Sequence, residues 1–197
     1  MRLVKSENDF YTSLEKALGE IDPDYWNYPG VIVMGTHGPM EVDEKLEEIK
    51  KAREEGIPFL GICFGLQMAV VEYARNVLGL KGANSTEIDL KTPHPVITKL
   101  PELRVGIYGV HWPSFGSRME SHWHNYAFNK KYDAEFQKDF YVSYTNDVAE
   151  IMQLRDHPFF MLMQFHPEYE SSKSKPHPIL KEFIEKCKDF SVAGPNL

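Results

Sequence analysis

A cysteine flanked by glycines follows an apolar run in the first half of the chain. Residues 61–65 read Gly-Ile-Cys-Phe-Gly, the spacing of a nucleophile on a tight turn between a strand and a helix. A helix that starts after Cys63 directs its first amides toward the sulfur, and their partial positive charge favours the thiolate. The amide of Phe64 would then donate to a developing oxyanion. We therefore predict that Cys63 is a nucleophile; the alternative is a small cysteine buried in a core strand.

A candidate base and its orienting group lie far downstream. Residues 164–168 read Gln-Phe-His-Pro-Glu and follow the apolar run 159–163, so His166 is expected at the end of a strand. Glu168 is close enough along the chain to bond the far ring nitrogen of His166 and fix its tautomer. Cys63, His166 and Glu168 would thus supply the nucleophile, base and orienting carboxylate of covalent acyl transfer.

Apolar runs and helical spacing predict the elements that must position these residues. Buried strands are expected to end at residues 3–4 and to cover 31–34 and 57–62, with helices over 10–21, 42–55 and 64–78. This alternation predicts an α/β fold, an open and mostly parallel sheet flanked by helices, with a nucleophile elbow. For the second half we expect strands over 105–110, 141–145, 151–154 and 160–164, a helix near 178–187, and a loop or irregular strand pair over 112–133.

Length and charge limit the function classes. The chain has 197 residues, which predicts one domain over residues 1–190 followed by a tail, 191–197. Its net charge of −7 argues against a nucleic-acid or membrane partner held by a basic face. No apolar run approaches the roughly 20 residues of a membrane span, and the N-terminus has no apolar signal segment. With two cysteines as well, we expect a cytoplasmic location.

Residues 58–67 and 164–168 together resemble the class I (triad) glutamine amidotransferases. The match narrows to the glutaminase domain of CTP synthases, which is similar at residues 9–18, 74–80, 83–87, 92–97, 156–160 and 175–178. The resemblance implies the amidotransferase fold, with Cys63 as nucleophile, His166 as general base and acid, and Glu168 as orienting carboxylate. It also implies attack on a γ-carboxamide, a γ-glutamyl thioester, release of ammonia and hydrolysis.

The same resemblance implies a substrate-binding set. Gln67 and Glu87 match positions that hold the amino-acid end of glutamine, and Gly35 and Phe64 match the backbone donors of the oxyanion hole. Two further positions, Thr36 and Asn125, belong to the predicted set although they depart from the family pattern.

These departures lie in two segments. Thr36 and His37 replace a glycine and an aromatic residue of the oxyanion strand, and residues 121–129 lack every arginine of the corresponding family segment, one of them at Asn125. Arg118 is a candidate replacement. His122 and His124 would share one face of a strand and line the pocket; no metal and no cofactor are expected.

The leading hypothesis is a cysteine-dependent amidohydrolase acting on a small molecule, glutamine or a γ-glutamyl compound. No amidoligase segment precedes the matched region in this chain, so it is not expected to make CTP itself; one version delivers ammonia to a separate synthetase subunit. The alternatives are a γ-glutamyl hydrolase that does not use free glutamine, and a non-catalytic amidotransferase-like binding module.

Overall fold

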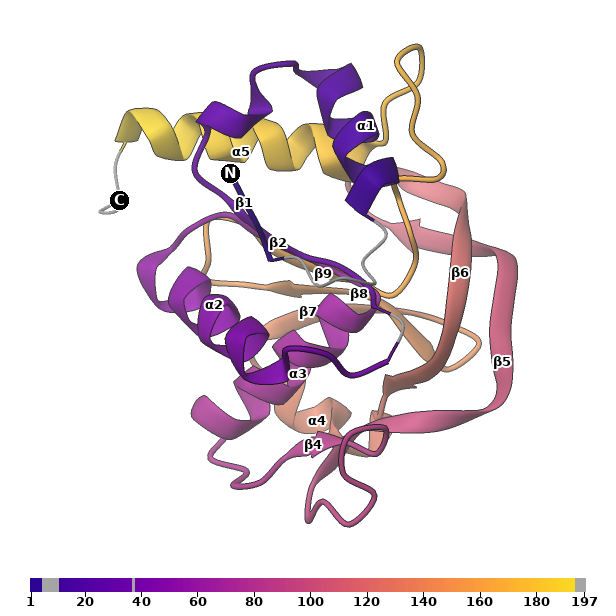
Figure 1. The fold of residues 1–197 in the computed structure, drawn as a ribbon. Helices are drawn as coiled ribbons and strands as arrows, with labels where there is room; N and C mark the ends of the chain where they lie inside the picture. Colours follow the sequence, from indigo (N-terminus) through magenta and orange to yellow (C-terminus); the bar gives the residue numbers. More distant parts are fainter. Residues whose placement is uncertain (5–10, 37, 194–197) are drawn as a thin grey trace.

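Strands and helices alternate in the N-terminal part of the chain, and strands dominate its second half (Figure 1). The computed structural model describes residues 1–4, 11–36 and 38–193. The elements in chain order are β1 (Arg2–Val4), α1 (Tyr11–Ile21), β2 (Val31–Val33), α2 (Val42–Glu55), β3 (Phe59–Ile62), α3 (Phe64–Asn76), β4 (Asn84–Ser85), β5 (Pro95–Trp112), β6 (Gly116–Phe128), α4 (Asp133–Phe136), β7 (Phe140–Thr145), β8 (Val148–Leu154), β9 (Phe160–Met163) and α5 (Pro178–Ala193). Single 3₁₀ turns cover Tyr25–Asn27 and Lys130–Tyr132.

The main sheet has the strand order β1-β2-β3-β9-β8-β7. The first four strands run parallel, and β8 and β7 complete the sheet in the antiparallel sense. This confirms the predicted open, mostly parallel sheet. The pairing of β3 with β9 matters most for the site, because Ile62 lies opposite Met163 and the residues that follow each strand emerge side by side.

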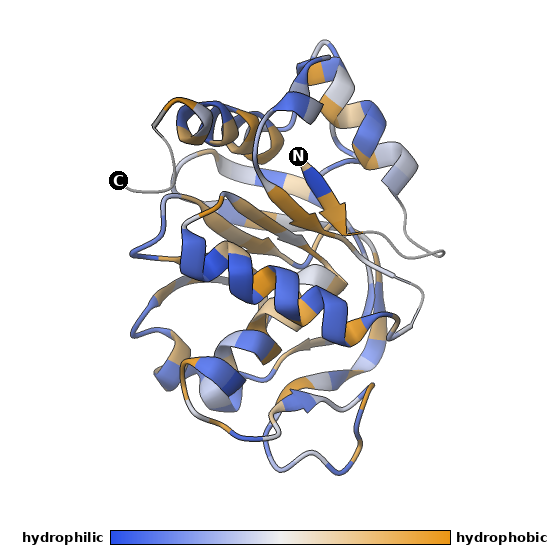
Figure 2. Cartoon of the chain, turned by 60° about the vertical axis from the view of Figure 1, so that its left-hand side comes forward, coloured by the Kyte–Doolittle hydropathy of each residue, from blue (hydrophilic) through white to orange (hydrophobic). Residues whose placement is uncertain are grey.

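Alternate residues of the central strands face two separate apolar clusters. On β3, Phe59 packs with the helices α2 and α3, whereas Leu60 and Ile62 pack with α1 and α5. Strands β2 and β9 divide in the same way. Figure 2 shows the result, hydrophobic strands enclosed between helices with largely hydrophilic outer surfaces. Helices therefore cover both faces of the sheet, as nearly continuous apolar strands require.

The long hairpin of β5 and β6 corrects the prediction for residues 112–133. Most of that segment is a regular strand paired antiparallel with β5, with one register shift between Lys99 and Arg104. The period of two is present in its burial, but the buried positions are polar: Glu120, His122 and His124. A hydropathy pattern could not reveal a strand whose inward face carries acid and imidazole groups.

One smaller boundary also differs from expectation. Helix α5 continues through Ala193, so residues 191–193 extend the helix instead of forming a tail, and residues 194–197 lie outside the described residues. The first helix is described from Tyr11, and its predicted first position, Phe10, lies outside the described residues. Nowhere in residues 1–4, 11–36 or 38–193 does a helix have the length and apolarity needed to cross a membrane.

Candidate active site

Cys63 occupies a strained elbow between β3 and α3. Its φ of 55° and ψ of −105° lie outside the regions that residues with a side chain ordinarily adopt. The turn depends on the two neighbouring glycines. A Cβ on Gly65 would overlap the carbonyl oxygen of Val33, and one on Gly61 would lie 2.9 Å from Leu162 Cδ2. The sequence spacing therefore reflects a real packing requirement.

His166 and Glu168 reach the same edge of the sheet from the segment after β9. The Cys63 amide donates to the Met163 carbonyl at 2.7 Å, which ties the elbow to the end of β9. His166 Nδ1 lies 2.7 Å from Glu168 Oε1, and both side chains are buried. A Cβ built on Gly35 would lie 3.3 Å from both Cys63 Cβ and His166 Cε1, so the two residues converge on this glycine.

Opposing influences act on the His166 imidazole. Burial alone lowers its pKa, but the Glu168 carboxylate, together with a hydrogen bond and charge from Cys63, raises the pKa to about 10. The protonated ring is therefore the stable form at neutral pH. An imidazolium beside a cysteine favours the thiolate, which is the reactive form.

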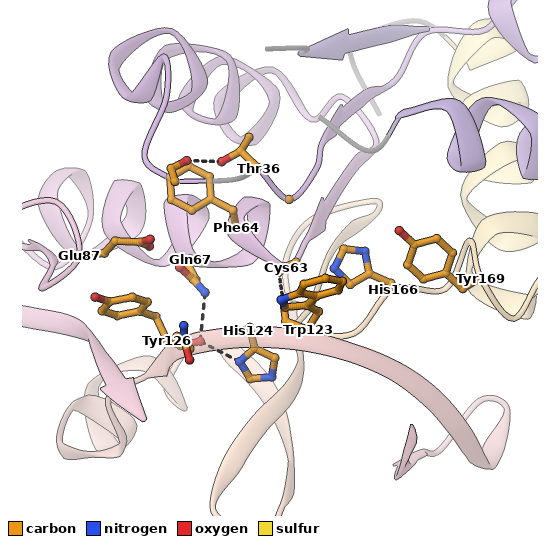
Figure 3. Close-up of a pocket in the computed structure, with 13 residues that line it drawn as sticks. Thr36, Cys63, Phe64, Gln67, Glu87, Trp123, His124, Tyr126, His166 and Tyr169 are labelled. Carbon is orange, nitrogen blue, oxygen red and sulfur yellow. Dashed lines mark hydrogen bonds between the residues drawn. The ribbon is translucent and has the colours of Figure 1, made fainter. Parts of the chain in front are cut away.

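The Cys63 sulfur has further polar neighbours that the sequence did not reveal. Gln164 Nε2 lies 3.7 Å from Sγ. The Trp123 carbonyl oxygen lies 3.8 Å from Sγ (Figure 3). Gln164 stands two positions before His166, a spacing that could have suggested a shared face. By contrast, burial raises the pKa of the Cys187 thiol to about 12, so Cys187 stays protonated at neutral pH and is a poor nucleophile.

A cavity of about 170 Å³ opens beside the sulfur. All six residues of the predicted substrate-binding set line it: Gly35, Thr36, Phe64, Gln67, Glu87 and Asn125. Cys63 and His166 line it as well, and Glu168 contacts His166 from outside the lining. A larger cavity of about 620 Å³ between the β5–β6 hairpin and β7 contains none of these residues.

Other lining residues come from the hairpin and the loop after β9. Trp123, His124 and Tyr126 of β6 complete the wall opposite α3 (Figure 3). Gly38 and Tyr169 also line the cavity, and sequence reasoning missed both. The Tyr169 ring stacks on His166 with centroids 5.4 Å apart; nothing in its sequence position marks this contact.

The comparisons with known proteins agree on one family. The family model for class-I glutamine amidotransferases matches residues 6–186. The chain belongs to this family. Among curated relatives of this amidotransferase, the CTP synthase of Phytoplasma australiense is 43% identical over 206 residues, covering 94% of this chain and 36% of that protein. The CTP synthase of Thermomicrobium roseum is 41% identical over 197 residues, covering 89% and 36%. This chain thus spans about a third of the length of these relatives.

A solved structure shows the same fold. The glutaminase domain of Trypanosoma brucei CTPS with bound acivicin matches this amidotransferase with a TM-score of 0.84, covering 95% of this chain and 92% of that one. The two sequences are 22% identical, so the likeness concerns the fold.

Arg118 does not replace the missing arginines of the pocket. Its Nε pairs with buried Glu120 at 3.0 Å, and it is not among the residues that line the cavity. The other arginine of the hairpin, Arg104, pairs with buried Glu150 and lies over the Tyr108 ring. Both guanidinium groups therefore form ion pairs with buried carboxylates of the protein, and neither lines the cavity.

The two histidines predicted to share a face do so, with different partners. The ring centroids of His122 and His124 lie 5.7 Å apart. His122 contacts the Glu150 carboxylate and the Glu120 carbonyl oxygen, while His124 reaches the cavity wall. No group of three metal-ligating side chains occurs within the described part of the chain. His37, the other altered position of the oxyanion strand, lies outside it.

Proposed function

We propose that this chain is a cysteine-dependent amidohydrolase that cleaves a γ-carboxamide through a thioester. The observation that carries the proposal is the convergence of Cys63 on an elbow with the His166–Glu168 pair around Gly35. A strained nucleophile beside a base that is itself oriented by a carboxylate is the arrangement that covalent acyl transfer needs.

The first half-reaction forms the thioester. The Cys63 thiolate attacks the γ-carbonyl carbon, a C–S bond forms, and the negative charge moves to the carbonyl oxygen. Backbone amides at Gly35 and at Phe64, the first residue of α3, would stabilise that oxyanion. The His166 imidazolium then gives its proton to the amide nitrogen, the C–N bond breaks, and ammonia leaves.

The second half-reaction restores the enzyme. Neutral His166 removes a proton from water as the water oxygen attacks the thioester carbon. The C–S bond breaks, the thiolate returns beside the imidazolium, and the product leaves as a carboxylic acid that gives its remaining proton to water. The curated relatives are CTP synthases. An ammonia-consuming synthetase is therefore the partner class that we propose for the released ammonia.

The test pairs two cysteine variants. Ammonia release from a panel of γ-carboxamides should fall to background in Cys63→Ala, whereas Cys187→Ala should stay within about twofold of wild type. Circular dichroism checks that both variants fold.

Thiol labelling tests the nucleophile without any substrate. Iodoacetamide should modify Cys63 much faster than Cys187, and the difference should disappear in His166→Ala. Equal and slow labelling of both cysteines in the wild-type protein would contradict the proposal.

A further inference from the structure

The end of the cavity farthest from the chemistry presents hydrogen-bond acceptors that no described residue satisfies. Glu87 is half-buried, and burial raises the pKa of its carboxyl; no described side chain pairs with it. Gln67 donates its Nε2 to the Tyr126 carbonyl oxygen at 3.1 Å, which leaves Oε1 buried without a partner. Figure 3 shows the Glu87 carboxylate reaching toward Gln67.

His124 also lines the cavity. Its Nδ1 lies 2.9 Å from the Tyr126 carbonyl oxygen; a carbonyl only accepts, so Nδ1 carries the proton. The other ring nitrogen, Nε2, is buried without a partner among the described residues, and in Figure 3 it points away from Gln67 and Glu87. Burial lowers the pKa of His124 to about 3, so the ring stays neutral and Nε2 can only accept.

The same wall offers no fixed positive charge. Among the described residues that line the cavity there is no lysine or arginine. The two hairpin arginines, Arg104 and Arg118, are neutralised by Glu150 and Glu120. The protonated His166 lies at the reacting end and is paired with Glu168. A ligand ammonium fits this wall, whereas a ligand carboxylate beside Glu87 would meet repulsion without a counter-charge.

We infer that the preferred substrate is a γ-carboxamide with a free α-ammonium and no free α-carboxylate, as in a glutamine whose α-carboxyl is held in an amide bond. This inference rests on the proposed function and names its substrate class. The ammonium contacts the Glu87 carboxylate and the unpartnered Oε1 of Gln67. When the α-carboxyl is held in an amide bond it carries no negative charge, so the substrate needs no cation from the cavity wall.

The decisive experiment compares three probes that differ only at these groups: L-glutamine, L-glutamine α-methylamide, and N-acetyl-L-glutamine α-methylamide. Ammonia from each reports only γ-cleavage. We expect kcat/KM for the α-methylamide to exceed that for glutamine by about tenfold or more, the scale of one charge-assisted hydrogen bond. Acetylation of the amine should remove at least that factor.

Two pocket variants sharpen the comparison. Glu87→Gln should lower kcat/KM for the α-methylamide by about tenfold or more and lower it by a smaller factor for the acetylated probe, because only the charged amine loses an ionic partner. Asn125→Arg adds a cation to the wall and should shift the preference toward free glutamine. Cys63 labelling should remain fast in both variants.

The outcomes separate the inference from the proposed function. Faster turnover of free glutamine than of its α-methylamide overturns the inference and leaves the amidohydrolase intact. If none of the three probes is turned over and Cys63 labels slowly, the proposed function fails. Calorimetric binding of the probes to Cys63→Ala protein then still decides the inference: tighter binding of the α-methylamide than of glutamine supports it, and the reverse order overturns it.

Discussion

The two ends of the cavity differ in how their polar groups are used. At the reacting end, the Cys63 sulfur and the His166 ring each have a protein partner within the resting structure. At the recognition end, Gln67, Glu87 and His124 present acceptors without one. The groups that we propose to react are therefore held in place by the protein itself, whereas the acceptors at the recognition end await hydrogen-bond donors from a ligand.

The two ends also come from different parts of the fold. The reacting groups follow adjacent parallel strands, β3 and β9, where a buried sheet fixes their separation. The recognition groups come from three separate places: helix α3, the segment after β4, and strand β6 of the hairpin. Changes at the reacting end should therefore affect folding and rate, and changes at the recognition end should affect substrate choice.

The largest effect is expected at the elbow. Gly65→Ala places a methyl group against the Val33 carbonyl oxygen, in backbone that cannot move without disturbing the sheet. We expect the free energy of unfolding to fall by more than about 4 kcal/mol and Cys63 reactivity to be lost. Chemical denaturation and thiol labelling measure the two effects.

Gly109→Ala is the matched control for that substitution. A Cβ there lies 3.9 Å from Met119 Sδ, an ordinary contact, so stability should change by less than about 1 kcal/mol. Equal stability of the two variants would mean that the elbow does not need the close approach at Gly65.

A smaller effect is expected from Glu168→Gln. Removing the carboxylate leaves burial as the main influence on His166 and lowers the pKa of its ring, so the imidazolium is lost at a lower pH. Turnover should fall roughly 10²- to 10⁴-fold, less than in Cys63→Ala. The pH above which the imidazolium no longer assists iodoacetamide labelling of Cys63 should therefore be lower in the variant than in the wild type.

The neighbouring acid Glu170 provides the control. Its Oε1 accepts from Ser121 Oγ at 2.8 Å and does not contact His166 in the described structure, so Glu170→Gln should keep the wild-type labelling profile. A labelling profile shifted in Glu170→Gln, or one unchanged in Glu168→Gln, would contradict the proposed orienting role of Glu168.

The smallest effect on activity is expected from Arg118→Ala. This change removes a partner of buried Glu120 and should lower the free energy of unfolding by about 1–3 kcal/mol. Because Arg118 does not line the cavity, KM for the best γ-carboxamide should stay within about twofold. A large rise in KM with unchanged stability would show instead that Arg118 reaches the substrate.

The sequence predicted the parallel half of the fold well and the hairpin poorly. Strands β2, β3 and β9 are buried on both faces, so their apolar runs are nearly continuous and easily recognised. Strand β6 buries Glu120 and His122, each hydrogen-bonded to a partner from another part of the chain. Local hydropathy cannot anticipate partners distant in the chain, so the sequence predicts an irregular segment there.

The candidate site divides in the same way. Residues 61–65 indicate the proposed nucleophile because the elbow requires glycine at two fixed positions. Residues 164–168 place the proposed base and its carboxylate two positions apart. The stacking of Tyr169 on His166 and the contact of Gln164 with the sulfur depend on rotamers and packing that no spacing encodes.

The fold class, the family pattern and the residues that we propose as reacting groups could be predicted from the sequence alone, since these follow from local backbone constraints and short-range spacing. Only the tertiary structure decided the charge of the recognition wall. Arg118 and Arg104 could bind a substrate carboxylate only if no protein carboxylate held them. In the folded chain Arg118 pairs with Glu120 of the hairpin and Arg104 pairs with Glu150 of β8. Long-range ion pairing and burial set the availability of a charge, and both arise only when distant segments pack together.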